Sequence, residues 1–129
     1  MDTTDEDKEV TILIAEDEES NFLLLKTILK KYCNILQARN GIELLHIYAE
    51  KGADLILLDI KMPEMNGIEA LKELRKNDKK VPVIMQSAYA FESDMEAAQE
   101  AGSNGFITKP INIAEFKQTI SKFLPQIKW

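Results

Sequence analysis

Acidic side chains, a hydroxyl and an amine follow four short apolar segments of this chain. A run of four carboxylates, Glu16–Glu19, follows the first segment, and Asp59, Ser87 and Lys109 follow three others. Carboxylates held together repel one another, and Mg²⁺, a hard cation that binds one or two carboxylates plus waters, offsets that repulsion. A carboxylate beside such a cation can attack phosphorus, while an amine and a hydroxyl stabilise the equatorial phosphoryl oxygens. The set predicts phosphoryl chemistry with Asp59 as the nucleophile and with Ser87 and Lys109 binding the phosphate.

Each of these residues also has a plainer explanation. An acid after a strand is usually a helix cap, a lone serine is usually a turn residue, and a lone lysine is usually a solvated cation. The joint arrangement favours the chemical interpretation, because all four groups follow segments whose carboxyl ends would meet at one edge of a parallel sheet.

A nucleotide site is a competing interpretation that the first turn disfavours. Sites for dinucleotides or flavin phosphates need a glycine-rich or hydroxyl-rich turn there, so that backbone N–H groups can approach a phosphate. Here the turn consists of the carboxylates Glu16–Glu19, which would repel a phosphate. We therefore expect neither NAD nor FMN to bind.

Five apolar runs predict the strands that position these groups. They are residues 10–15, a weaker run at 34–38, and residues 54–58, 81–85 and 105–108. The runs are continuous rather than alternating, which is typical of strands buried on both faces of a parallel sheet. With helices between them, they predict an open, doubly wound α/β sandwich of five β-α units.

Apolar residues at helical spacing predict the helices and their buried faces. The expected faces are Phe22, Leu25, Leu29 and Tyr32, then Ile42, Leu45 and Ala49, then Ile68, Leu71 and Leu74, and finally Ile113, Phe116, Ile120 and Phe123. Three pairs have capping-box spacing, namely Asn66 with Glu69, Ser93 with Glu96, and Asn112 with Glu115. The helix predicted near residues 94–101 offers few large apolar side chains, so we expect it to be weakly packed and movable.

The composition fits one soluble globular domain and excludes several classes of protein. The chain has 129 residues and a formal net charge of -6, and no apolar run approaches the roughly 20 residues of a membrane span. An acidic balance argues against nucleic-acid binding, and one cysteine and one histidine exclude an internal disulfide and a zinc site. Residues 1–9 are acidic, so we expect a flexible acidic head (1–9), one domain (10–129) and a cytoplasmic location.

The segment from Val10 to about Leu124 resembles a known family, the receiver domains of two-component response regulators. The resemblance rests on the acid pair Glu16-Asp17, on Asp59 in Leu-Leu-Asp-Ile-Lys-Met-Pro-Glu-Met-Asn-Gly, on Ser87-Ala88 and on Lys109-Pro110. It implies a flavodoxin-like (βα)5 fold with a parallel sheet in the strand order 2-1-3-4-5. Residues 86–94 look most like the receivers of hybrid sensor histidine kinases, which favours a receiver excised from such a kinase over a stand-alone regulator.

The resemblance also implies a role for each site residue. Asp59 would accept a phosphoryl group from a kinase phosphohistidine. Mg²⁺ would be bound by Asp17, Asp59 and the backbone carbonyl of Lys61, with Glu16 acting through water. The phosphate would be held by Ser87, Lys109 and the N–H of Ala88, while Phe106 would turn inward as Ser87 moves. A cis bond between Lys109 and Pro110 is implied as well.

The expected function is a phosphorylation switch that assists its own phosphotransfer and dephosphorylation, rather than an enzyme. Its partners would be a histidine kinase or a histidine phosphotransfer protein and a downstream protein or output domain, with no nucleic acid and no membrane contact. The domain would be a monomer or a weak phosphorylation-dependent dimer, and Lys61 and Tyr89 would tune the lifetime of the aspartyl-phosphate.

Two other functions remain open at this stage. One is a phosphorylation-independent interaction module of the same fold. The other is a haloacid-dehalogenase-like phosphatase, which the lysine at position 61 disfavours because that chemistry needs an acid there. His46 is expected to be structural, and the basic cluster Lys72, Arg75, Lys76, Lys79 and Lys80 is expected to be a solvated face that complements a helix dipole.

Overall fold

Five strands and five helices alternate along the chain in a computed structural model that describes residues 8–88 and 92–129. The strands are β1 (Val10–Ala15), β2 (Cys33–Ala38), β3 (Leu55–Asp59), β4 (Val83–Ser87) and β5 (Gly105–Thr108). The helices are α1 (Glu19–Leu29), α2 (Gly41–Lys51), α3 (Gly67–Asn77), α4 (Glu92–Ala101) and α5 (Ile113–Phe123). The alternation confirms the predicted β-α units.

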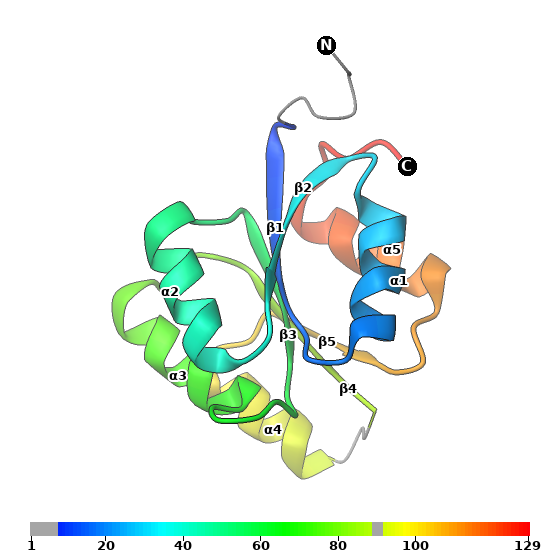
Figure 1. Ribbon diagram of the computed structural model, residues 1–129. Helices are drawn as coiled ribbons and strands as arrows, with labels where there is room; N and C mark the ends of the chain where they lie inside the picture. The colour runs from blue at the N-terminus through cyan, green and yellow to red at the C-terminus, as the bar shows by residue number, and fades with distance from the viewer. Residues whose placement is uncertain (1–7, 89–91) are drawn as a thin grey trace.

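All five strands are parallel and lie in the order β2-β1-β3-β4-β5. Helices α1 and α5 cover one face of the sheet, and α2, α3 and α4 cover the other (Figure 1). Two separate hydrophobic cores fill the spaces on either side, one around Phe22, Ile84 and Phe116, the other around Leu58 and Leu71. The flavodoxin-like fold and the strand order are therefore as the sequence implied.

Three asparagines cap the helices. Asn66 and Glu69 form a reciprocal capping box at the start of α3, and the Asn112 side chain accepts from the Glu115 N–H at α5. Asn40 caps α2 in the same way. Ser93, in contrast, is inside α4 rather than ahead of it, because that helix begins at Glu92.

The predicted buried face of α2 was right only for Leu45, which is partly buried against the core. Ile42 and Ala49 are exposed, whereas Leu44 is fully buried. Gly41 explains the difference, because a Cβ there would lie 2.7 Å from the Met65 carbonyl oxygen in the loop after β3. This close approach fixes how the helix is rotated. Ile113, predicted on the buried face of α5, is also exposed.

The basic cluster at the end of α3 is only partly solvated. Four of its members are exposed lysines, but Arg75 is half-buried. Its guanidinium donates to the Gly102 carbonyl oxygen at 2.9 and 3.0 Å and to Asn104 Oδ1 at 2.9 Å. Arg75 thus fastens α3 to the turn between α4 and β5.

Both ends of the described chain contact residues at the start of β2. Lys8, from the segment expected to be the acidic head, exchanges hydrogen bonds with Asn34 at 3.0 and 2.8 Å. The ring of Trp129 packs edge-on against Tyr32, with 5.1 Å between centroids. Residues 1–7, the rest of the expected head, lie outside the described residues.

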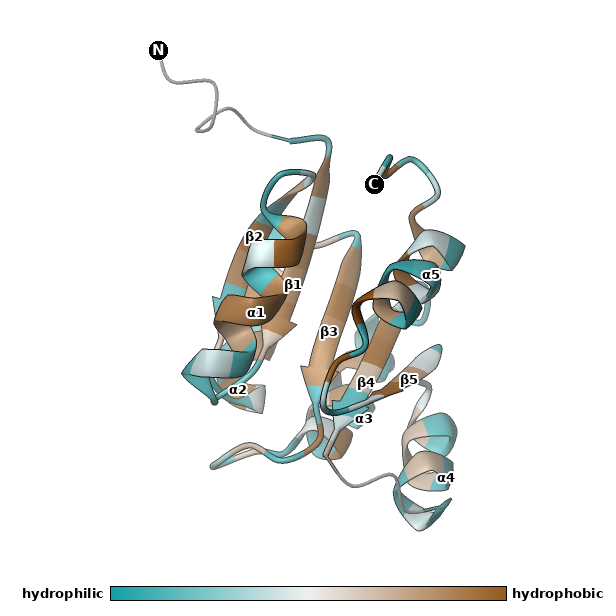
Figure 2. Cartoon of the chain, turned by 90° about the vertical axis from the view of Figure 1, so that its right-hand side faces the viewer, coloured by the Kyte–Doolittle hydropathy of each residue, from teal (hydrophilic) through white to brown (hydrophobic). Residues whose placement is uncertain are grey.

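The strands are apolar along most of their length and end in polar segments at one edge of the sheet (Figure 2). In a parallel sheet these carboxyl ends gather the loops that follow β1, β3, β4 and β5, so residues distant in sequence meet there. Within the part of the chain that the structure describes, no helix is long and apolar enough to cross a membrane.

Candidate functional site

Glu16 directly follows β1, and its side chain is completely buried at the carboxyl edge of the sheet. Its backbone N–H donates to the Ala38 carbonyl oxygen at 2.9 Å, which extends the pairing of β1 with β2. Its Oε1 accepts from the Glu18 N–H at 3.2 Å. The side chain therefore points inward, toward the ends of β3 and β4.

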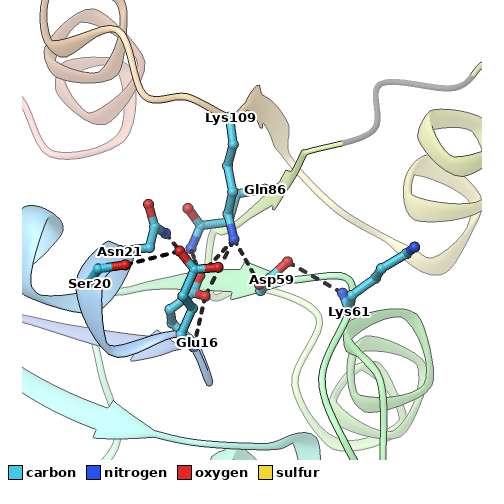
Figure 3. A network of polar contacts seen from close by, with 8 residues as sticks. Glu16, Ser20, Asn21, Asp59, Lys61, Gln86 and Lys109 are labelled. Atoms are coloured by element: carbon cyan, nitrogen blue, oxygen red, sulfur yellow. Dashed lines mark hydrogen bonds and ion pairs between the residues drawn. The ribbon is translucent and has the colours of Figure 1, made fainter.

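Lys109 lies between Glu16 and Asp59 (Figure 3). Its Nζ donates to Asp59 Oδ2 at 2.9 Å and to both oxygens of Glu16, at 3.1 and 3.3 Å. Its backbone N–H donates to the Ser87 carbonyl oxygen at 2.8 Å, and the bond to Pro110 is cis, as the resemblance implied. The amine offsets the repulsion between two buried carboxylates.

Asp17 completes a cluster of acids. Oxygens of Glu16, Asp17 and Asp59 all lie within 4.8 Å of one another, and Asp17 is exposed while the other two are buried. Carboxylate oxygens in such a cluster suit a hard divalent cation such as Mg²⁺. The cluster borders an open cleft of about 310 Å³, lined by Asp17, Glu18, Asp59, Lys61, Ser87, Ala88 and Lys109.

Lys61 contributes its backbone to the site. Its N–H donates to Asp59 Oδ1 at 3.3 Å, and its side chain is exposed beside the cleft. A second open cleft, of about 510 Å³, adjoins the first and is lined by Asp17, Ile60, Lys61, Met62, Pro63 and Asn66. The role of the Lys61 carbonyl as a metal ligand stays a prediction.

Ser87 and Ala88 also line the cleft. Ser87 ends β4 and is only 2% exposed, whereas Ala88 is exposed. Phe106, on the neighbouring strand, is half-buried against the core beneath α3 and α4. Their roles in binding phosphate and in switching stay predictions, and Tyr89 lies outside the described residues.

Two groups in the site, Glu16 and Lys109, have raised pKa values. Burial raises the pKa of Glu16 above its ordinary value, and the Asp59 charge raises it further, against the opposing effect of Lys109 and Asn21. For Lys109, burial alone would lower the pKa, but the hydrogen bond and charge of Asp59 together with Glu16 more than offset it, so its pKa is raised. The amine therefore stays protonated at neutral pH.

The sequence interpretation missed two residues of the site. Asn21, in the first turns of α1, donates from Nδ2 to Glu16 Oε2 at 2.9 Å, and the Gln86 amide on β4 donates to the same oxygen at 3.5 Å. Gln86 could have been noticed as an amide within an otherwise apolar strand. Asn21 carried no such signal. His46 is exposed on α2, away from the cleft residues.

Comparison with known proteins agrees with this geometry. The family model described as "Response regulator receiver domain" matches residues 12–121. The polar-differentiation response regulator DivK of Brucella anthropi is 35% identical over 117 residues, which cover 88% of this chain and 95% of that protein.

Solved structures of similar fold include receiver domains of histidine kinases. One is from a sensor histidine kinase of Pseudomonas aeruginosa, with a magnesium ion coordinated in its active site cleft. It has a TM-score of 0.82 and 27% identity, covering 90% of this chain and 98% of that one. Another, from Syntrophus aciditrophicus, has a TM-score of 0.83 and 30% identity, covering 92% of both chains. On its fold, its cluster of acids and the matched family model, the chain belongs to the response regulator receiver domain family of two-component systems.

Proposed function

We propose that this domain is the phosphoacceptor of a two-component phosphorelay, with Asp59 as the residue that is phosphorylated. The observation that carries the proposal is the triad in which the partly buried Lys109 contacts two buried acids, with its Nζ 2.9 Å from Asp59 Oδ2 and also bonded to Glu16. An amine at this distance from the acceptor carboxylate can contact a phosphoryl oxygen once the phosphoryl group is attached.

The transfer itself is a displacement at phosphorus. A carboxylate oxygen of Asp59 forms the new P–O bond while the P–N bond of a partner's phosphohistidine breaks, and the imidazole leaves with the bonding electrons and takes up a proton. Lys109, the Ser87 hydroxyl and the Ala88 N–H hold the phosphoryl oxygens. Ser87 and Ala88 support this role because they line the same cleft as Asp59.

The acid cluster fits Mg²⁺ as the cofactor. Asp17, Asp59 and the Lys61 carbonyl would bind the ion, with Glu16 acting through water, and all of these donors are hard oxygens. Bound Mg²⁺ supplies positive charge that offsets the repulsion between the carboxylates and the phosphoryl oxygens. The magnesium ion in the Pseudomonas aeruginosa receiver domain supports this assignment.

Phosphorylation would act as a switch on a protein-binding face. Ser87 moves toward the phosphoryl group and Phe106 turns into the space, which alters the surface formed by α4, β5 and α5. The small buried area of α4 supports this, because only Ala98 and Ala101 of that helix are buried. A new charge at Asp59 would thereby favour one of two packings.

The partners follow from this chemistry. The donor is a histidine kinase or a histidine phosphotransfer protein, and the receiver of the signal is a downstream protein or an output domain. We place this event in the cytoplasm and assign the domain to residues 10–129. The similarity to both DivK and kinase receivers supports either a stand-alone regulator or a hybrid-kinase receiver.

The test is the intact mass of the protein after incubation with acetyl phosphate and Mg²⁺. We expect one phosphoryl adduct in the wild type, and no adduct either without the metal ion or in Asp59→Asn. Asp54→Asn is the matched control, because Asp54 is an exposed acid at the other end of β3 and should leave the adduct intact.

An absence of adduct in the wild type under every condition would contradict the proposal. It would favour the second candidate, a phosphorylation-independent interaction module that retains the fold. The intact set of Asp59, Lys109 and the acid pair at one edge is the observation against that module.

A further inference from the structure

The Glu16 carboxylate has no contact with solvent, so protein groups must satisfy its hydrogen-bonding capacity. Its Oε2 accepts from three side chains: Asn21 at 2.9 Å, Lys109 at 3.1 Å and Gln86 at 3.5 Å. One of these donors is charged and is shared with Asp59. The other two are neutral amides, which come from α1 and β4 (Figure 3).

Gln86 places a polar side-chain amide in a buried part of the sheet. It is 2% exposed and pairs in register with Asp59 on the neighbouring strand. Its backbone carbonyl accepts from the Ile60 N–H at 3.1 Å, which ties it to the segment just after Asp59. A buried side-chain amide without a partner would be destabilising, and Glu16 is the acceptor that compensates it here.

Asn21 donates to the same oxygen from a different element of the fold. It lies in α1, the helix that follows the acidic run, and it is half-buried. Its neighbour Ser20 donates instead to Glu18 Oε1, at 3.0 Å, and is exposed. Of these two adjacent polar side chains, only Asn21 is directed at the buried acid.

Lys109 cannot serve every acceptor at once. It contacts three carboxylate oxygens in this structure, and a phosphoryl group on Asp59 would add another acceptor that attracts the same amine. When Lys109 turns toward the phosphoryl group, its bonds to Glu16 weaken. The amides of Asn21 and Gln86 are neutral, so the phosphoryl charge attracts them less than it attracts Lys109. They therefore keep their hydrogen bonds to Glu16.

We propose that Asn21 and Gln86 are positioning residues that hold the Glu16 carboxylate in place for Mg²⁺ and for its bound water, independently of Lys109. This inference rests on the proposed function of Asp59 and assigns a role to two residues outside the acid cluster. Groups that hydrogen-bond to a metal-binding acid without contacting the metal typically contribute about tenfold or more to metal affinity.

The test is isothermal titration calorimetry of the full chain with magnesium chloride and no phosphate donor. We expect Asn21→Ala and Gln86→Leu each to raise the Mg²⁺ dissociation constant by about tenfold. The matched control Ser20→Ala should leave it unchanged. Leucine is close to glutamine in size, and Asn21 is only half-buried, so both variants should fold. Their thermal unfolding without Mg²⁺ checks this.

A double-variant experiment separates positioning from a general effect on the fold. In a Glu16→Gln background there is no carboxylate left for Asn21 to position, so adding Asn21→Ala should change the dissociation constant no further. Unchanged Mg²⁺ affinity in both single variants, or an equal loss in the Glu16→Gln background, would overturn the inference. Wild type that binds Mg²⁺ but forms no adduct with acetyl phosphate would instead overturn only the proposed function.

Discussion

Lys109 supplies the positive charge that holds Glu16 and Asp59 together, and its amine is largely shielded from solvent. We predict that Lys109→Met will destabilise the protein by about 3 kcal/mol near pH 8, because a buried acid then loses its cation. Methionine keeps much of the apolar length of the side chain, so the loss reports mainly on charge.

The loss in this variant should shrink as the pH falls. Burial already raises the pKa of Glu16, and without the amine that pKa rises further, so the folded protein retains a proton that the unfolded chain has released. Below about pH 4.5, the ordinary pKa of a glutamate, this bound proton gives the folded variant its full extra stability. That extra stability is lost as the pH rises through the raised pKa of Glu16.

Urea unfolding at about pH 5 and about pH 8, without Mg²⁺, measures the effect. Lys76→Met is the matched control, because Lys76 pairs with Glu73 on the surface and both side chains are largely exposed. An equal loss at the two pH values in Lys109→Met would contradict the prediction.

At the scale of residues, the sequence predicted the charged and hydroxyl groups at the strand ends. It missed the two amides, Asn21 and Gln86, that donate to the Glu16 carboxylate. Glu16, Asp59, Ser87 and Lys109 were found because each follows an apolar run. Asn21 was not, because its direction depends on how α1 packs on the sheet. Periodicity indicates an apolar face of a helix, but it does not show which side chains of another element a polar residue of that helix will reach.

The turn between β3 and α3 depends on Gly67. A Cβ on this residue would overlap the Asp59 carbonyl oxygen and would lie 2.9 Å from its carbonyl carbon. The Gly67 N–H also donates to the Ile60 carbonyl oxygen at 2.8 Å. The first residue of α3 therefore presses directly on the backbone of the proposed phosphoacceptor.

We predict that Gly67→Ala will destabilise the protein by about 1–3 kcal/mol and slow phosphorylation by acetyl phosphate, because the backbone at Asp59 must shift. Urea unfolding and adduct formation by mass spectrometry measure the two effects. Gly105→Ala is the matched control, since the nearest atom to its added Cβ is Ile84 Cγ1 at 3.6 Å, an ordinary contact. Equal behaviour of the two variants would refute the argument.

The arrangement of elements was predicted well, but the rotation of α2 was not. The sequence favoured Ile42 and Ala49 as buried, and the structure buries Leu44. The helix carries apolar residues on more than one face, and Leu45 of the predicted set does pack against the core. The contact of Gly41 with the loop at Met65 selects one of these faces, and that contact joins residues 24 positions apart in sequence.

The whole molecule separates its charges along the direction of the strands. All five helices begin at the carboxyl edge of the sheet, and each has an acid in its first turn: Glu19, Glu43, Glu69, Glu92 and Asp94, and Glu115. Four of them have a basic residue in the last turn: Lys26, Lys51, Arg75 with Lys76, and Lys122. These charges complement the helix dipoles, because the acids lie at the positive helix N-termini and the basic residues at the negative C-termini.

Mg²⁺ bound at the acid cluster of Glu16, Asp17 and Asp59 should stabilise the entire domain. An ion that binds only the folded chain adds about 2.7 kcal/mol at a hundred times its dissociation constant, or about 10 °C in the unfolding midpoint for a domain of this size. Differential scanning calorimetry with and without magnesium chloride measures the shift. Asp59→Asn should show a much smaller shift, and an equal rise in that variant would place the ion elsewhere.

The contacts of Lys8 with Asn34 and of Trp129 with Tyr32 place both ends of the described chain beside the start of β2, at the amino edge of the sheet. The cleft lies at the carboxyl edge. A polypeptide joined at either end would leave the molecule away from Asp59. A phosphate donor on such a tether could reach the cleft only by folding back around the domain, so the length of the tether would set its effective concentration there.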